Sequence, residues 1–157
     1  MDDLIRALPQ LLRAAGESDE VAEMAASVAW RRVAGEGLRG VAVPFRLYRK
    51  TLVVAVPDHT WQRQLETVSG QLLFRLNSVL GQAVVTFIEF RVDPKTVQAE
   101  RARLPKSATD QQAQEARALE RTSGTLAEAA AAIHDETLRR RFLIAAGSYI
   151  EAQEQKR

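Results

Sequence analysis

Hydrophobic positions recur along the chain at two spacings, and the change from one to the other marks the predicted elements. Apolar residues three or four apart over 3–15 predict a short amphipathic helix, which Pro9 is expected to kink or to delay. Ser18 is a suitable N-cap for a second helix, which is apolar on two faces and is therefore expected to lie between other elements. Gly35 and Gly37 are expected to end it.

Alternation of apolar and polar residues over 41–48 and 51–56 predicts the two strands of a β-hairpin. Pro44 has no N–H to donate to a ladder, so we expect the first strand at a sheet edge or a bulge at the proline. Arg49 and Lys50 form the turn, although tight two-residue turns need positive φ at both positions and favour Asn-Gly. Either the loop is longer than two residues or two cations are needed at its tip.

The second strand leads directly into a helix, because Pro57 stops the strand and Asp58 is a suitable N-cap. Apolar residues keep a helical spacing over 61–79, and Ser69-Gly70 leaves open a division into two helices. A third strand is predicted over 84–92. Three strands with helices on one face make an α+β, two-layer domain.

Polar residues dominate the segment after Asp93-Pro94, and this dipeptide is expected to end the domain. Residues 95–123 have too few large apolar side chains to hold a core, which predicts a linker with at most local helix. Beyond it, Asp135 can cap the second of two helices that form a hairpin, which is too small to be stable unless it docks. The predicted organisation is an N-terminal helix at 1–17, a domain at 18–93, a flexible linker at 94–123 and a helical hairpin at 124–157.

With 157 residues, of which 46% are apolar and 27% charged, the chain has the ordinary composition of one globular domain with a tail. No apolar stretch is long enough to cross a bilayer, and the N-terminus lacks the pattern of a signal peptide. The absence of cysteine excludes disulfides and thiolate metal sites. We therefore expect a bacterial-type cytoplasmic protein with no membrane partner.

The net charge is only +2, but the charges are unevenly distributed. Residues 1–23 are acidic and residues 31–91 are basic, which favours a polyanion as partner; a solvated surface of mixed charge is the alternative. Arginine and lysine neutralise phosphates with little sequence preference. The candidate phosphate-binding side chains are Arg31, Arg32, Arg46, Arg49, Lys50 and Arg63.

Aromatic side chains are the second class of candidate for nucleic-acid contact. Trp30 and Trp61 lie on helical stripes with aliphatic residues, so burial in the core is a better interpretation than stacking on bases. Tyr48 and Phe87, with two arginines, share the sheet face turned away from the helices. They can form a stacking platform, but we expect residues 4–15 or the C-terminal helices to cover that face.

No catalytic constellation is found. His59 follows Asp58, but adjacent helical residues diverge in direction and no nucleophile is indicated. Two separate histidines in a chain without cysteine argue against a zinc site. Gly35-x-Gly37 lacks the preceding strand and the lysine of a P-loop. The sequence therefore predicts a binding protein that is no enzyme and needs no cofactor.

An ordered series of motifs runs through residues 18–92. They are Trp30-Arg-Arg-Val33-Ala-Gly35, Pro44, Leu52-Val-Val-Ala-Val56, Trp61 with Leu65, Leu72-Leu73, Leu76-Asn77, Gly81 and Ile88-Glu-Phe90. Together these motifs resemble the DciA family of bacterial proteins, which load or operate the replicative DNA helicase DnaB. The resemblance implies a KH-like fold, binding to DNA, and a C-terminal extension that engages the helicase. One departure is the position of the KH GxxG loop, which reads Val68-Ser69-Gly70-Gln71 here and argues against phosphate clamping by that loop.

The C-terminal helices carry an apolar stripe that consists of Leu126, Ile133, Leu138, Phe142 and Tyr149. The stripe can pack on its own domain, or it can present an apolar face to a partner in the helix-in-groove manner. The resemblance favours the second arrangement, with the DnaB-type helicase as the partner.

Residues and resemblance together predict a non-enzymatic adaptor in DNA replication initiation. Its KH-like domain would bind DNA, single- or double-stranded, and its C-terminal helices would bind the replicative helicase and promote its loading. This role implies a cytoplasmic, nucleoid-associated protein. The alternatives are an RNA-binding KH-like module and a protein-interaction scaffold without a nucleic-acid role.

Overall fold

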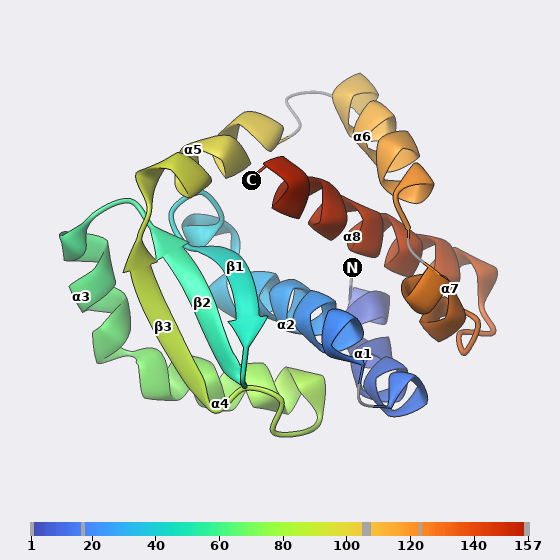
Figure 1. Ribbon diagram of the computed structural model, residues 1–157, viewed down its shortest axis with the longest axis horizontal. Coiled ribbons are helices and arrows are strands. Elements are labelled where there is room, and N and C mark those ends of the chain that lie inside the picture. Colours follow the sequence, from blue (N-terminus) through green and yellow to red (C-terminus); the bar gives the residue numbers. More distant parts are fainter. Residues whose placement is uncertain (1, 17, 105–107, 123, 156–157) are drawn as a thin grey trace.

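The computed structural model describes residues 2–16, 18–104, 108–122 and 124–155, which form a three-stranded sheet with helices around it (Figure 1). The first elements are α1 (Asp2–Ala15), α2 (Asp19–Ala34), the 3-10 helix η1 (Glu36–Leu38), β1 (Val43–Tyr48), β2 (Thr51–Val56), α3 (His59–Thr67), α4 (Ser69–Leu80) and β3 (Phe87–Val92). They are followed by α5 (Pro94–Arg103), α6 (Ala108–Glu120), α7 (Gly124–Ala130) and α8 (Glu136–Gln155). The predicted α+β class is confirmed.

Local sequence signals set the ends of the central helices. The Ser18 hydroxyl accepts a hydrogen bond from the Val21 amide and starts α2. The Asp58 carboxylate accepts one from the Trp61 amide at 2.9 Å and starts α3 directly after β2. Gly35 ends α2 with φ at 76°. These predicted caps are all present.

The helical stretch over 59–80 is divided, as Ser69-Gly70 allowed. Val68 leaves the helical conformation (φ −106°, ψ 10°), so α3 and α4 are separate helices. Gly81 ends α4 in the left-handed region, and a Cβ at this position would lie 2.9 Å from the ring of Pro9. Pro9 itself lies inside α1 and does not delay the start of that helix. Glycine is therefore needed where the end of α4 meets α1.

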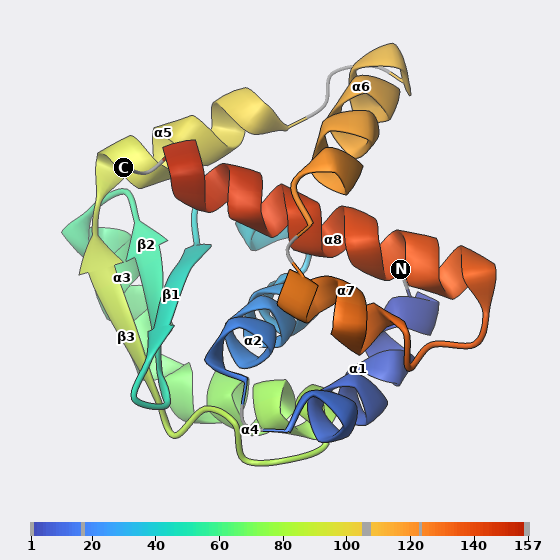
Figure 2. The ribbon, with the colours of Figure 1, turned by 45° about the vertical axis from the view of Figure 1, so that its right-hand side comes forward.

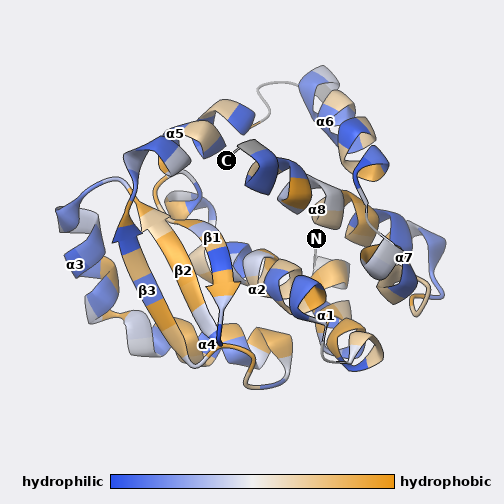
Figure 3. Cartoon of the chain, viewed as in Figure 1, coloured by the Kyte–Doolittle hydropathy of each residue, from blue (hydrophilic) through white to orange (hydrophobic). Residues whose placement is uncertain are grey.

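The sheet has the order β1-β2-β3, with β1 antiparallel to β2 and β2 parallel to β3. β1 is an edge strand, and its register with β2 shifts between Pro44 and Arg46. An edge position and a bulge were the two solutions expected for Pro44, and the structure has both. Figure 3 shows that β2 is apolar over most of its length, as a central strand requires.

Helices α2 and α4 cover one face of the sheet, and α1 packs on these two helices and completes the main core (Figure 1). Trp30 of α2 is fully buried there, donates its indole N–H to the Ala42 carbonyl at 3.1 Å and meets the ring of Phe90 at a centroid distance of 6.2 Å. Trp61 is half-buried against the same core. The interpretation of the two tryptophans as packing residues is thereby confirmed.

The segment predicted as a flexible linker contains α5 and α6. Asp93 accepts a hydrogen bond from the Thr96 amide at 3.2 Å and Pro94 lies in the first turn, so this dipeptide starts α5. Val97 is fully buried against β1 and β2, on the side of the sheet away from the main core. The predicted linker is therefore helical over its described residues, and α5 adds a helix to the second face of the sheet.

Helices α6 and α8 pack on each other very closely. A Cβ on Gly147 of α8 would lie 1.7 Å from the carbonyl oxygen of Ala118 in α6, so only glycine fits there. The side chain of Arg103 in α5 donates to the Ser148 carbonyl of α8 at 3.1 Å. These contacts join the segment after the sheet to the last helix (Figure 2).

Side chains of α2 and α8 close the exposed edge of β1. The Glu23 carboxylate accepts a hydrogen bond from the Leu47 amide at 3.0 Å, and the Gln153 amide group donates to the Phe45 carbonyl. Gln153 also donates to the hydroxyl of Tyr149 at 2.9 Å. Burial, followed by the nearby Glu23, raises the pKa of Tyr149 above its ordinary value. The last helix is thus fixed to the sheet by polar as well as apolar contacts.

Candidate nucleic-acid interface

The tip of the β1-β2 hairpin is a two-residue turn of two cations. Tyr48 pairs with Thr51, so Arg49 and Lys50 alone connect the strands, with φ at 49° and 64°. Positive φ at both positions defines a type I′ turn, which costs a residue with a side chain about 1–2 kcal/mol. The alternative of a longer loop is wrong, and the turn places two exposed cations at its tip at the cost of strain.

The neighbouring strand holds this turn in place. The Lys50 carbonyl accepts hydrogen bonds from the Thr86 amide at 2.8 Å, the Thr86 hydroxyl at 3.3 Å and the Phe87 amide at 3.4 Å. The Arg49 guanidinium lies 5.3 Å from the centre of the Tyr48 ring, within the range of a cation–π contact. The backbone of the tip is therefore fixed while its two charges remain exposed.

One part of the sheet surface next to the tip is uncovered. Tyr48, Thr51 and Phe87 pair in one row across the three strands. Leu52 and Ile88 of the adjacent row are buried in the main core, so by alternation the first row faces the other way. Tyr48 is 58% and Phe87 is 60% exposed.

We call this row, together with the next row on the same face (Arg46, Val53 and Glu89), the open face. The expectation that residues 4–15 or the C-terminal helices cover it is wrong. α1 packs on the main core, and α5 reaches only the rows nearer the start of β1 (Figure 1). Sequence reasoning identified these aromatic residues but not their exposure, because exposure depends on where α5 docks.

The six cations selected from the sequence do not form one surface. Arg46 lies on the open face, close to the two cations of the tip. Arg31 and Arg32 lie in the last turn of α2 and Arg63 lies in α3, and these helices join the sheet at its opposite end. A strand of six residues separates the two ends by about 17–20 Å. Only Arg46, Arg49 and Lys50 therefore form a local cluster.

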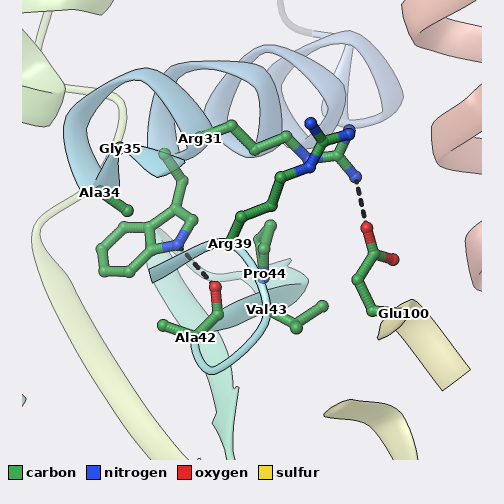
Figure 4. Close-up of a pocket in the computed structure, with 9 residues that line it drawn as sticks. Arg31, Ala34, Gly35, Arg39, Ala42, Val43, Pro44 and Glu100 are labelled. Atoms are coloured by element: carbon green, nitrogen blue, oxygen red, sulfur yellow. Dashed lines mark hydrogen bonds and ion pairs between the residues drawn. The ribbon is translucent and has the colours of Figure 1, made fainter. Parts of the chain in front are cut away.

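Arg31 already has a partner within the protein. Its guanidinium lies 3.4 Å from the carboxylate of Glu100 (Figure 4). This carboxylate is 5% exposed and also binds Arg103 at 3.0 Å. Burial is the main cause that lowers the pKa of Arg31, and Glu100 opposes it. The cavity beside this pair measures about 10 Å³, far below the roughly 300 Å³ of the smallest typical ligand pockets. Arg31 thus joins α2 to α5.

The C-terminal stripe faces inward. Leu126 and Phe142 are fully buried, Ile133 and Tyr149 nearly so, and Leu138 is half-buried, all within the main core. Helices α7 and α8 pack on α1 and α2 (Figure 2). Of the two arrangements left open, the structure has the one in which the stripe packs on its own domain. The expectation that it is presented to a partner is wrong for this arrangement.

The described residues give no support for a metal site, a catalytic pair or a membrane span. They contain no group of three or more His, Asp or Glu side chains close enough to hold a metal ion. The Asp58 carboxylate caps α3, and His59 Nδ1 lies 3.0 Å from Oε1 of Gln62. Among these same residues, no helix combines the length and apolar character needed to cross a membrane.

Comparisons with known proteins match the first part of the chain. The model of a protein family described as "Dna[CI] antecedent, DciA" matches residues 3–90, which include all of α1 except Asp2, the hairpin tip and the open face. A UPF0232 protein of Mycolicibacterium smegmatis is 34% identical over 79 residues. That alignment covers 50% of this chain and 41% of the relative, so the chain matches less than half of the relative's length.

Proposed function

The chain belongs to the DciA family, and on this premise we propose that it is a non-enzymatic adaptor in DNA replication initiation. Its KH-like domain binds DNA at the hairpin tip, and its C-terminal helices bind the DnaB-type replicative helicase. Joining the two contacts in one chain raises the effective concentration of DNA near the helicase and promotes loading. Such an adaptor acts in the bacterial cytoplasm, at the nucleoid.

The hairpin tip is the observation that carries the DNA contact. Arg49 and Lys50 occupy positions that Asn-Gly would occupy with less strain, and strain of this kind is typically stored where side chains serve a function. Their charges project beyond the sheet, next to the exposed Arg46. Arginine and lysine bind phosphates through charge and counterion release, with little sequence preference. The tip is suited to contact a nucleic-acid backbone.

Replacing the turn with its least strained sequence, R49N/K50G, separates stability from binding. We expect unfolding to require about 1 kcal/mol more free energy, because the left-handed strain is relieved. We expect DNA affinity at low salt to fall about tenfold, and the dependence of log K on log salt concentration to become shallower by about 1.4 for a single strand, because two phosphate contacts are lost. Urea unfolding and fluorescence anisotropy with a labelled oligonucleotide measure the two effects.

The matched control is R6Q/R13Q, which removes the same charge from exposed positions of α1. It is expected to leave DNA affinity nearly unchanged. Equal weakening by the two double variants would show that overall charge, and not the tip, attracts DNA. An oligoribonucleotide of the same sequence serves as a third arm. Clearly tighter binding of the RNA would replace the DNA adaptor with an RNA-binding module.

The helicase contact is expected on the outer side of the C-terminal helices, because their apolar stripe is buried. The turn that leads into α8 is exposed over residues 134–137, and Arg140 is exposed one turn further along. A chain truncated after Asp93 is unsuitable for this test, because it would uncover the core surfaces of α1 and α2 that α7 and α8 bury. Substitutions on the exposed side of the full chain are preferable.

Reversing the charge of Arg140 (R140E) is expected to weaken capture of the purified DnaB-type helicase about tenfold. The reason is that the new carboxylate would repel the acidic helicase surface that Arg140 is proposed to contact. The same reversal at the exposed Arg75 of α4 is the control and is expected to have little effect. Capture is measured by biolayer interferometry with the immobilised full chain. If wild-type protein captures no helicase, the adaptor proposal fails.

A further inference from the structure

The open face differs in kind from an ordinary protein-docking surface. Its first row presents two largely exposed aromatic rings, Tyr48 and Phe87, one on each outer strand, with the small Thr51 between them. Strands lie about 4.8 Å apart, so the two backbones that carry the rings are about 10 Å apart. Such a row offers two separate flat surfaces rather than a continuous aliphatic patch.

The surroundings of these rings are strongly polar. The next row contains Arg46 and Glu89 on either side of Val53, which is itself buried. Beyond the first row, the turn adds Arg49 and Lys50, and the Arg49 guanidinium lies over the Tyr48 ring. Glu89 is paired with Arg91 at 2.9 Å, which leaves the cations of this end in excess. Aromatic rings within a cationic border suit a ligand that is flat, apolar on its faces and anionic along its backbone.

We propose that Tyr48 and Phe87 form a stacking platform for unpaired bases of a nucleic acid whose phosphates lie along Arg46, Arg49 and Lys50. The inference rests on the proposed DNA contact and deepens it, because stacked pairs inside a duplex cannot reach the rings. Bases of any identity have a flat π face, so the platform selects single strands without selecting sequence. Two bases of an extended strand occupy the two rings, and the tip fixes the backbone beside them.

Phe87 is the better residue for the test. The Tyr48 ring makes a cation–π contact with Arg49, so replacing Tyr48 would also disturb the tip. Replacing Phe87 avoids this effect. Its amide donates to the Lys50 carbonyl through the backbone, which a side-chain substitution leaves in place. Because the ring is 60% exposed, its loss is expected to leave the fold intact, and urea unfolding verifies this for each variant. Phe74 is 76% exposed and lies in α4, which packs on the opposite face of the sheet, so it provides a matched control.

The experiment uses the full chain and measures anisotropy with oligothymidylate, oligouridylate and a blunt DNA duplex of equal length. F87L, which keeps apolar area but removes the π face, is expected to weaken binding of both single strands about tenfold and to leave duplex binding unchanged. F87W is expected to restore single-strand affinity, and F74L to leave it at the wild-type value. Equal effects on the two single strands identify the stacked base, and not the sugar, as the ligand.

Other outcomes overturn the platform. If F87L binds single strands as tightly as the wild type, or weakens binding of single strand and duplex equally, no base stacks on Phe87. Binding of DNA by the charged tip is not affected by this outcome. If F87L instead reduces capture of the helicase and not of the oligonucleotides, the open face is a protein contact. The R49N/K50G variant distinguishes the charged DNA contact from the stacking platform, because it is expected to weaken binding of the duplex and of the single strands together. A wild-type chain that binds neither defeats the DNA contact itself.

Discussion

Replacing Trp30 with alanine is expected to destabilise the protein by about 3–5 kcal/mol, the largest effect of any single substitution considered for this chain. Trp30 is fully buried between α2 and the sheet, so its removal leaves a cavity that the surrounding helices fill only in part. The same change deprives the Ala42 carbonyl of its hydrogen bond from the indole and removes the contact with Phe90. Each of these losses adds to the transfer free energy of the ring.

Urea unfolding monitored by circular dichroism measures this effect without depending on tryptophan fluorescence. W61A is the control, since Trp61 is only half-buried and its loss is expected to cost clearly less. W30F keeps an aromatic ring in the core but removes the N–H donor and part of the volume, so it is expected to destabilise the protein less than W30A. If W30A and W61A are equally destabilising, Trp30 is not at the centre of the core.

Replacing Glu100 with glutamine is expected to destabilise the protein by about 3 kcal/mol. Glu100 is almost completely buried, and its carboxylate binds Arg31 at 3.4 Å (Figure 4) and Arg103 at 3.0 Å. Without the negative charge, two cations remain close together in a poorly solvated site. Loss of one member of a buried ion pair typically costs about 3–5 kcal/mol. The lower end of this range applies here, because the two arginine side chains keep some exposure. Burial already lowers the pKa of Arg31, which reflects the cost of holding its charge there.

The matched control is E89Q. Glu89 pairs with Arg91 at 2.9 Å, but both side chains are about half exposed, so we expect a loss of at most about 1 kcal/mol. The double variant R31M/E100M is expected to be more stable than E100Q, because it removes a buried charge together with its partner. If E100Q and E89Q behave alike in urea unfolding, α5 is not held to α2 by this cluster.

The error about that segment has a physical explanation. Residues 95–123 are mostly polar, and composition averaged over such a stretch predicts too little burial for a core. α5 instead docks through one apolar side chain, Val97, and one buried carboxylate, Glu100, whose partner on another element is Arg31 of α2. No local pattern identifies a buried glutamate, because its burial depends on Arg31, which lies 69 positions away in the sequence.

The candidate site could be predicted only in part from the sequence, for a similar reason. The cations of the turn and the aromatic residues of the sheet were identified from alternation and turn chemistry. Whether Tyr48 and Phe87 are covered depends on the length of α5 and on the angle at which it crosses the sheet, and the sequence specifies neither. The same holds for the C-terminal stripe, whose periodicity predicts an apolar face but not the surface that this face meets.

The sequence by itself determined the elements and their order, because caps, glycines and apolar periodicity act within a few residues of one another. Asp58, Gly81 and Pro44 each have the local role that their chemistry requires. Tertiary structure alone decided which faces are buried, because burial is a relation between segments distant in the chain. It enclosed the C-terminal stripe, paired Arg31 with Glu100, and left two aromatic rings exposed beside the strained, doubly charged turn.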